Sequence, residues 1–117
     1  WPVKVRIPDP SKDNAGTCIE QTFKMQFRAI EREDAVKAYE ERALLDDPRE
    51  VMNLEHAQLL ERCTNWDGVT EGEGDDARPM PFSEEALQSA LQHSWFRTAV
   101  YTALAESDAG LDHKTGN

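Results

Sequence analysis

The sequence predicts an α+β fold in which an N-terminal antiparallel β-hairpin packs on about four α-helices, with most residues helical. Two observations predict it. Apolar and polar residues alternate over residues 3–29, and from residue 31 the apolar residues recur at the spacing of amphipathic helices. With 117 residues, 38% of them hydrophobic and 31% charged, we expect a single domain over residues 1–107 and a flexible tail over residues 108–117.

Two amphipathic strands open the chain. Residues 3–7 alternate apolar with basic side chains between two prolines, a pattern typical of an edge strand. After turn-forming residues at 9–16 the alternation resumes, with Phe23 and Phe27 on its apolar face. We expect an antiparallel hairpin in which Phe23 and Phe27 are structural anchors. Helices must cover its apolar face, because a hairpin alone is marginal in water.

Two helices are expected over residues 31–66. The positions of the first helix that we expect to face the core are Ala35, Val36, Tyr39, Ala43 and Leu44. Asp47 and Pro48 suit the N-cap and first helical position of the second helix. The apolar stripe expected on that helix comprises Met52, Leu59, Cys63 and Trp66. Trp66 ends the helix and is interpreted as a structural anchor, because a tryptophan buries a large apolar area.

Two further helices are expected over residues 83–106. Ser83 suits an N-cap, and Phe82 and Leu87 stand at the spacing of a hydrophobic staple, so both are interpreted as structural anchors. A break at residues 93–94 separates the two helices, and Ser94 is expected to cap the second. Before them, the acidic and glycine-containing residues 67–78 carry little apolar weight, and we expect a mobile, solvated loop.

The acidic loop suggests a calcium site only superficially. Asp67 and Gly72 fall at the first and sixth positions of a calcium-binding loop. The third position is Val69, however, and the twelfth, where a bidentate glutamate belongs, is Arg78. We therefore interpret the segment as a solvated acidic loop.

No other residues have the spacing of a catalytic or metal site. The histidines are dispersed at His56, His93 and His113. Cys63 is seven residues from His56, about 10.5 Å along a helix, which is too far for a nucleophile–base pair. Cys18 shows no metal-ligand spacing to Cys63, so both are expected to be reduced thiols. We expect no enzyme activity, cofactor or metal, and no membrane span or signal peptide is evident.

Charge is distributed unevenly. Residues 1–45 carry eight basic and eight acidic side chains, whereas residues 46–117 carry five basic and fifteen acidic ones, which accounts for the net charge of −10. Nucleic acid is therefore an unfavourable partner, since its phosphates would be repelled. A basic protein surface is a better partner.

Trp95 and Phe96 are adjacent large aromatic residues in the last expected helix. They cannot both face the core, so at least one should be partly exposed. An ordinary exposed aromatic residue and an interface residue explain this pattern equally well. The candidates for partner binding are Trp95 and Phe96, together with Lys24 and Arg28 on the polar face of the hairpin.

Several of these features occur together in one known family. They are an opening strand Trp1-Pro2-Val3-x-Val5-x-Ile7-Pro8, an aromatic strand with Phe23 and Phe27, Trp66-x-Gly68-Val69 before an acidic loop, and Pro81-Phe82-Ser83 before a final pair of helices. In this order and spacing the chain resembles the small tail assembly chaperones of long-tailed bacteriophages and prophages, over residues 2–105.

The resemblance implies a non-enzymatic assembly factor. Such chaperones act in the cytoplasm of the bacterial host, bind the tape measure protein and help tail tube protein to polymerise around it. They are not retained in the mature virion, and relatives are often made in two lengths by a ribosomal frameshift. We expect the outer face of the hairpin or the Trp95–Phe96 corner to contact the client or another copy of the chain. The alternative is an acidic phage-encoded inhibitor that imitates the charge of DNA.

Overall fold

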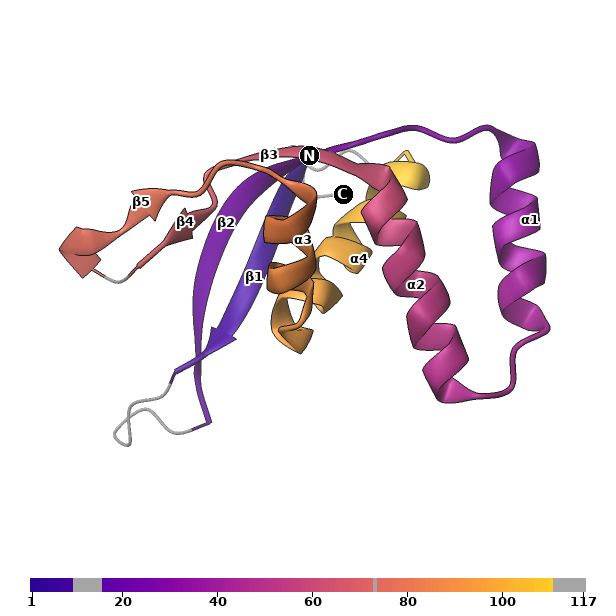
Figure 1. Cartoon of the computed structure of the whole chain (residues 1–117), viewed down its shortest axis with the longest axis horizontal. Coiled ribbons are helices and arrows are strands. Elements are labelled where there is room, and N and C mark those ends of the chain that lie inside the picture. The colour runs from indigo at the N-terminus through magenta and orange to yellow at the C-terminus, as the bar shows by residue number, and fades with distance from the viewer. Residues whose placement is uncertain (10–15, 73, 111–117) are drawn as a thin grey trace.

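A three-stranded antiparallel sheet forms one side of the protein in the computed structural model (Figure 1). Its strands are β1 (Pro2–Pro8), β2 (Cys18–Phe27) and β3 (Cys63–Asp67), with β2 in the centre and β1 at one edge. The structure describes residues 1–9, 16–72 and 74–110. The expected hairpin and the α+β class are confirmed. The turn residues 10–15, and residues 111–117 of the expected tail 108–117, lie outside the described part, whereas Asp108 is the last residue of the C-terminal helix.

The hairpin buries the face that the alternation predicts. Val3 lies opposite Phe23 in the register, and both side chains are buried, at 0% and 7% exposure. Val5 and Met25 are buried on the same face, because side chains two residues apart along a strand point the same way. Phe27, at the end of β2, is half-buried against this core.

β3 corrects the predicted helix that ends at Trp66. The second helix, α2 (Pro48–Arg62), stops at Arg62, and the chain continues as a strand that pairs with β2. Phe27 lies opposite Cys63 and Gln26 opposite Asn65, so Thr64 is an extra residue that forms a β-bulge. The bulge turns Cys63 and Trp66, three residues apart, to the same buried face. A bulged strand can therefore imitate the spacing of a helix.

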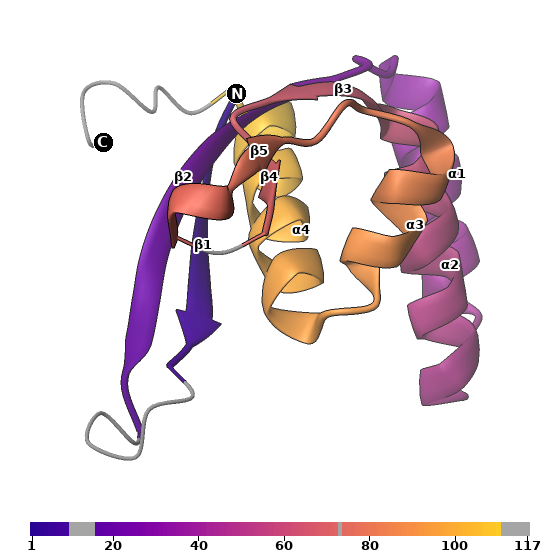
Figure 2. The same cartoon turned by 60° about the vertical axis from the view of Figure 1, so that its left-hand side comes forward.

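Two C-terminal helices cover the apolar face of the sheet (Figure 2). α3 (Glu84–Leu91) is capped by Ser83, whose Oγ accepts a hydrogen bond from the Ala86 amide at 3.0 Å, as predicted. α4 (Ser94–Asp108) follows the predicted break and lies against β1. The expected cap by Ser94 is wrong, since Ser94 is the first helical residue and His93 is the N-cap.

α1 (Arg32–Ala43) also differs from its prediction. It lies beyond α2 as seen from the sheet, in an antiparallel helical hairpin (Figures 1 and 2), and none of its residues is buried. The five positions expected to face the core, Ala35, Val36, Tyr39, Ala43 and Leu44, are all exposed. The prediction fails because α3 and α4 already occupy the face of the sheet.

The acidic segment after β3 has defined structure on both sides of residue 73. β4 (Thr70–Glu71) pairs with β5 (Arg78–Pro79), and a 3-10 turn, η2 (Gly74–Asp76), precedes β5. Gly72 has a φ of +89°, and a Cβ there would come within 2.8 Å of the Asp76 carbonyl oxygen. The segment thus contains short strands, and the described strand residues are exposed, in line with a solvated loop; its mobility stays a prediction.

Candidate protein-binding surfaces

The structure separates the two aromatic residues expected at a partner surface. Phe96 is only 6% exposed and stacks on Phe23 inside the core, at 5.3 Å between ring centroids. Trp95 is half-buried and stacks on His93, at 4.8 Å. Phe96 therefore belongs to the core, although it also lines a pocket of about 280 Å³ with Trp95, and Trp95 is the more accessible of the two. Partner binding by either residue stays a prediction.

Lys24 and Arg28 lie on a different part of the molecule from Trp95. Lys24 is exposed on β2 and faces Asp67 across the β2–β3 pairing. Arg28 follows β2 and forms an exposed ion pair with Glu61 of α2. The four candidate residues therefore do not form one surface.

The predicted anchors gather around one tryptophan. Trp66 is 7% exposed, and its Nε1 donates a hydrogen bond to the Met80 carbonyl oxygen at 2.6 Å. Phe82 meets Trp66 edge to face at 5.1 Å between ring centroids, and Leu87 is 1% exposed. This cluster attaches β3 to the start of α3, with Trp66 and Leu87 buried and Phe82 half-buried.

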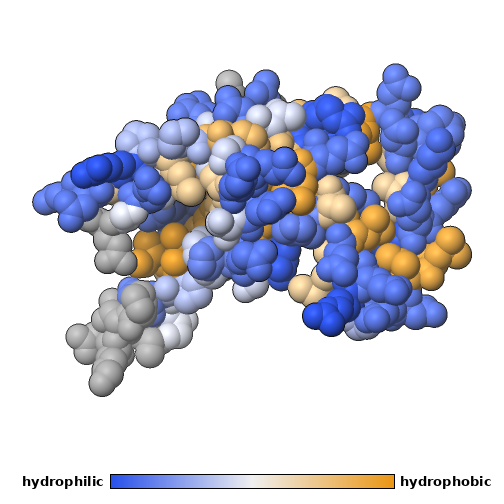
Figure 3. Space-filling view, in the orientation of Figure 1, coloured by the Kyte–Doolittle hydropathy of each residue, from blue (hydrophilic) through white to orange (hydrophobic). Residues whose placement is uncertain are grey.

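An apolar stripe on α1 is exposed to solvent. Val36, Tyr39 and Ala43, here called the α1 stripe, occupy spacings i, i+3 and i+7 and so share one face of the helix. Tyr39 is 77% exposed, and Leu44 just beyond the helix is 82% exposed. Figure 3 shows hydrophobic residues at the surface of this helical hairpin.

The other side of α1 faces α2. Asp34, Lys37 and Glu41 line a cavity of about 340 Å³ between the two helices, together with residues of α2. An ion pair between Arg42 and Glu55, at 2.9 Å, joins α1 to α2. α1 therefore turns the small residue Ala38 and several polar residues towards α2, and its α1 stripe away from it, so its larger apolar side chains are on the solvent side.

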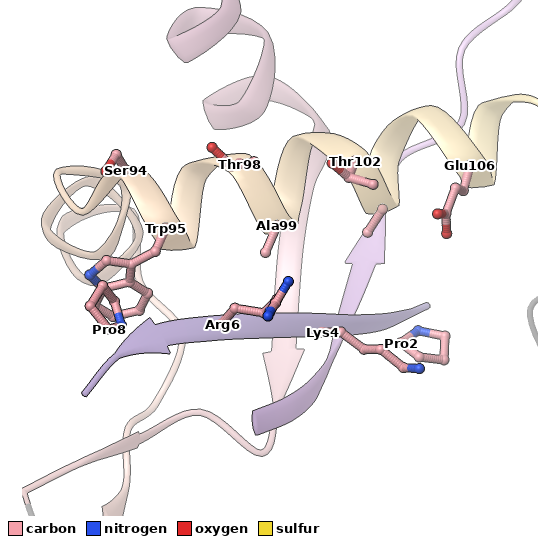
Figure 4. A pocket seen from close by; sticks show the side chains of 11 residues that line it. Pro2, Lys4, Arg6, Pro8, Ser94, Trp95, Thr98, Ala99, Thr102 and Glu106 are labelled. Carbon is pink, nitrogen blue, oxygen red and sulfur yellow. The ribbon is translucent and has the colours of Figure 1, made fainter. Parts of the chain in front are cut away.

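A second candidate surface is a groove between β1 and α4, here called the β1–α4 groove (Figure 4). Its volume is about 440 Å³. Trp95, Ala99 and Glu106 lie along its α4 wall, and Lys4 and Arg6 lie along its β1 wall. Trp95 was predicted from the sequence as a candidate, but the groove was not, because the proximity of β1 to α4 is a tertiary contact.

Two observations describe the metal-ligand and thiol chemistry of the described residues. In residues 1–9, 16–72 and 74–110, no three His, Cys, Asp or Glu side chains are placed to hold a metal ion. Burial raises the pKa of the Cys63 thiol to about 12, although the neighbouring Arg62 opposes the shift. Cys63 therefore remains a protonated thiol at neutral pH and is a poor nucleophile.

Comparisons with known proteins give no relative: no family model, curated protein or solved structure matches the chain. In the described part of the chain, no helix combines the length and apolar character that a membrane crossing requires. The α1 stripe and the β1–α4 groove both present accessible side chains to solvent.

Proposed function

We propose that this protein is a non-enzymatic tail assembly chaperone that binds the tape measure protein and promotes polymerisation of the tail tube. It would act in the cytoplasm of the bacterial host and be absent from the mature virion. The resemblance of the sequence provides the identity of the client. The observation that carries the proposal is the α1 stripe, which presents apolar side chains to solvent on a helix that is not needed to cover the sheet.

The α1 stripe suits a helical client. Apolar residues at i, i+3 and i+7 pack against the apolar face of another helix. Full burial of a side chain of the size of valine or leucine contributes about 1.5–3 kcal/mol. Val36, Tyr39 and Leu44 together therefore supply several kcal/mol at most, which is comparable to the lower end of the cost of association, about 4–15 kcal/mol. Such binding is weak enough for a client that must be released to the growing tail.

The net charge supports the same role. With a net charge of −10, each copy of the protein repels other copies, and complexes of the protein with a client repel one another. This repulsion opposes aggregation of an apolar client. Glu40 beside the α1 stripe is exposed and would remain solvated at the rim of such an interface.

Co-expression with the tape measure protein of the same gene cluster tests the proposal. We expect the wild-type chain to raise the soluble fraction of the tape measure protein, and Val36→Ser/Tyr39→Ser to abolish that effect. Glu41→Ser is the matched control, because Glu41 lies on the opposite side of the same helix and should retain the effect.

Unchanged client solubility with the wild-type chain would refute the chaperone proposal. The rival function, an acidic imitation of DNA, makes a different prediction. In a gel-shift assay a DNA mimic would displace a DNA-binding enzyme from its duplex, whereas a chaperone would leave the complex intact.

A further inference from the structure

The outer edge of β1 has a defined pattern of backbone groups. The Met25 amide donates to the Trp1 carbonyl oxygen at 2.8 Å, and the Asp9 amide donates to the Thr17 carbonyl oxygen at 3.1 Å. In an antiparallel ladder such hydrogen-bonded pairs recur at every second residue. The odd-numbered residues of β1 therefore bond to β2, and the even-numbered ones direct their backbone groups away from it. Within the described part of the chain, no strand pairs with this edge.

Only two of the even-numbered residues can donate. Lys4 and Arg6 each present an N–H and a C=O at the edge, whereas Pro2 and Pro8 present a carbonyl without an N–H. Proline at both ends limits pairing with another strand to the centre of β1. The edge is thus short, with a fixed place for a partner strand.

The β1–α4 groove runs along this edge. All four even-numbered residues of β1 line the groove, and none of the odd-numbered residues does. This is expected if the outward backbone groups of the even-numbered residues form one wall of the groove. The lining residues of α4 recur at every turn and are mostly small: Ser94, Trp95, Thr98, Ala99, Thr102, Ala103 and Glu106. From Ser94 to Glu106 the helix rises about 18 Å, which is the length of five or six residues of a β-strand.

Charge at this edge disfavours a second copy of the chain. If two β1 strands paired antiparallel through Lys4 and Arg6, Lys4 of one copy would face Arg6 of the other. Like charges directly opposite one another destabilise a pair of strands. The same two side chains favour acidic residues in a different partner.

We propose that the β1–α4 groove binds an extended segment of a partner protein as an added antiparallel strand, in which acidic and small apolar residues alternate. The acidic side chains would lie opposite Lys4 and Arg6 on the outer face of the sheet. The apolar side chains would point to the other face, towards Ala99 and Trp95 of α4. This surface is separate from the α1 stripe, so the inference does not depend on the proposed function.

Two acidic groups near the groove refine the preferred partner. Glu20 lies opposite Arg6 on β2 and attracts the same guanidinium, so Lys4 is the stronger site for an acidic side chain. Glu106 lines the α4 wall at the end of the groove and repels acidic side chains that point towards α4. The partner is therefore acidic on one face of its strand and apolar on the other.

A short capped peptide, acetyl-Glu-Val-Glu-Val-Glu-amide, is the probe. We expect saturable binding in an NMR titration, with shifts at Lys4, Arg6 and along α4, and slower hydrogen exchange at the Lys4 and Arg6 amides. The corresponding Lys-Val peptide should not bind. N-methylation of the central glutamate should abolish binding, because that amide points towards β1, whereas N-methylation of a valine should not.

Matched variants of the protein test the charge. Lys4→Glu and Arg6→Glu should each weaken peptide binding about fivefold or more, since attraction across the strands becomes repulsion. Lys24→Glu is the control: it makes the same change at an exposed lysine of β2 that does not line the groove. Circular dichroism should show that all three variants are folded.

Several outcomes would overturn the inference. They are no saturable binding, equal binding of the acidic and basic peptides, or equal weakening by Lys24→Glu and Lys4→Glu. Protection of the Lys4 and Arg6 amides that rises with protein concentration, without peptide, would instead identify a second copy as the occupant.

Discussion

Phe96 of α4 stacks on Phe23 of β2 with the ring planes 4° apart. Phe96 also meets Trp66 of β3 edge to face, at 6.4 Å between ring centroids. One side chain of the last helix therefore contacts two strands of the sheet. This contact holds α4 against the sheet and thereby sets the position of the β1–α4 groove.

Phe96→Ala should destabilise the protein strongly. Removal of a buried phenylalanine ring costs about 3–5 kcal/mol, because apolar contacts are lost and a cavity remains. Trp95→Ala, at the adjacent half-buried position, should cost about 1 kcal/mol. Urea unfolding measures both values. Equal costs at the two positions would contradict the different burial of these residues.

The ion pair of Arg62 with Asp108 should contribute more to stability than the exposed one of Arg28 with Glu61. Arg62 is 6% exposed, and its Nη1 and Nη2 donate to the two carboxylate oxygens of Asp108 at 3.0 and 2.6 Å. Asp108→Asn should cost about 1–2 kcal/mol, since it leaves a buried charge without its counter-charge, although Asp108 itself is partly exposed.

Glu61→Gln is the control for that prediction and should cost less than about 0.5 kcal/mol. Thermal unfolding of both variants at low and high salt separates the two pairs. Only the exposed pair should lose its contribution at high salt, because solvent ions screen it.

The two cysteines should differ in reactivity. Cys18 is exposed, whereas Cys63 is buried and has a pKa of about 12. At pH 8 a thiol reagent should modify Cys18 rapidly and Cys63 only as fast as the protein unfolds. Mass spectrometry of the labelled protein would show one modified cysteine; rapid labelling of Cys63 would contradict its burial.

The raised pKa of Cys63 also predicts lower stability in alkali. The folded protein keeps the Cys63 proton up to about pH 12, whereas the unfolded chain loses it above the ordinary thiol value of 9.0. Between these values the folded state binds more protons, so the free energy of unfolding falls as pH rises. Cys63→Ala should reduce this dependence in urea unfolding curves between pH 9 and 11.

Polar substitutions in the α1 stripe should barely change stability. Tyr39→Ser removes a side chain that is 77% exposed, so we expect a change of less than about 0.5 kcal/mol in the free energy of unfolding. Leu59→Ser, in the buried part of α2, should cost several times more. A large loss of stability with Tyr39→Ser would show that α1 packs on the core in solution.

The local features of this fold could be predicted from the sequence. Ser83 caps α3, and Asp47 caps α2 by accepting a hydrogen bond from the Arg49 amide at 2.9 Å. The alternation over residues 3–7 predicts the strand β1. Each of these features depends on residues that are close in the sequence, so it can be predicted without knowledge of the tertiary structure.

The features that were wrongly predicted depend on distant contacts. Cys63 and Trp66 show helical spacing, but pairing with β2 makes a bulged strand there. Tyr39 belongs to an apolar stripe that no element of the described chain covers. Of the candidate site residues, Trp95 lines a groove and Phe96 lies in the core. The sequence shows only that the two residues are adjacent, and adjacency does not tell which of them is buried.

The sequence by itself determined where β1, α2 and α3 begin, which residues alternate or recur as apolar, and where the negative charge lies. Only the tertiary structure decided which apolar faces are buried. An apolar face is buried only when another element of the chain packs against it, and in this protein α3 and α4 pack against the sheet. That choice leaves the α1 stripe and the edge of β1 open to partners.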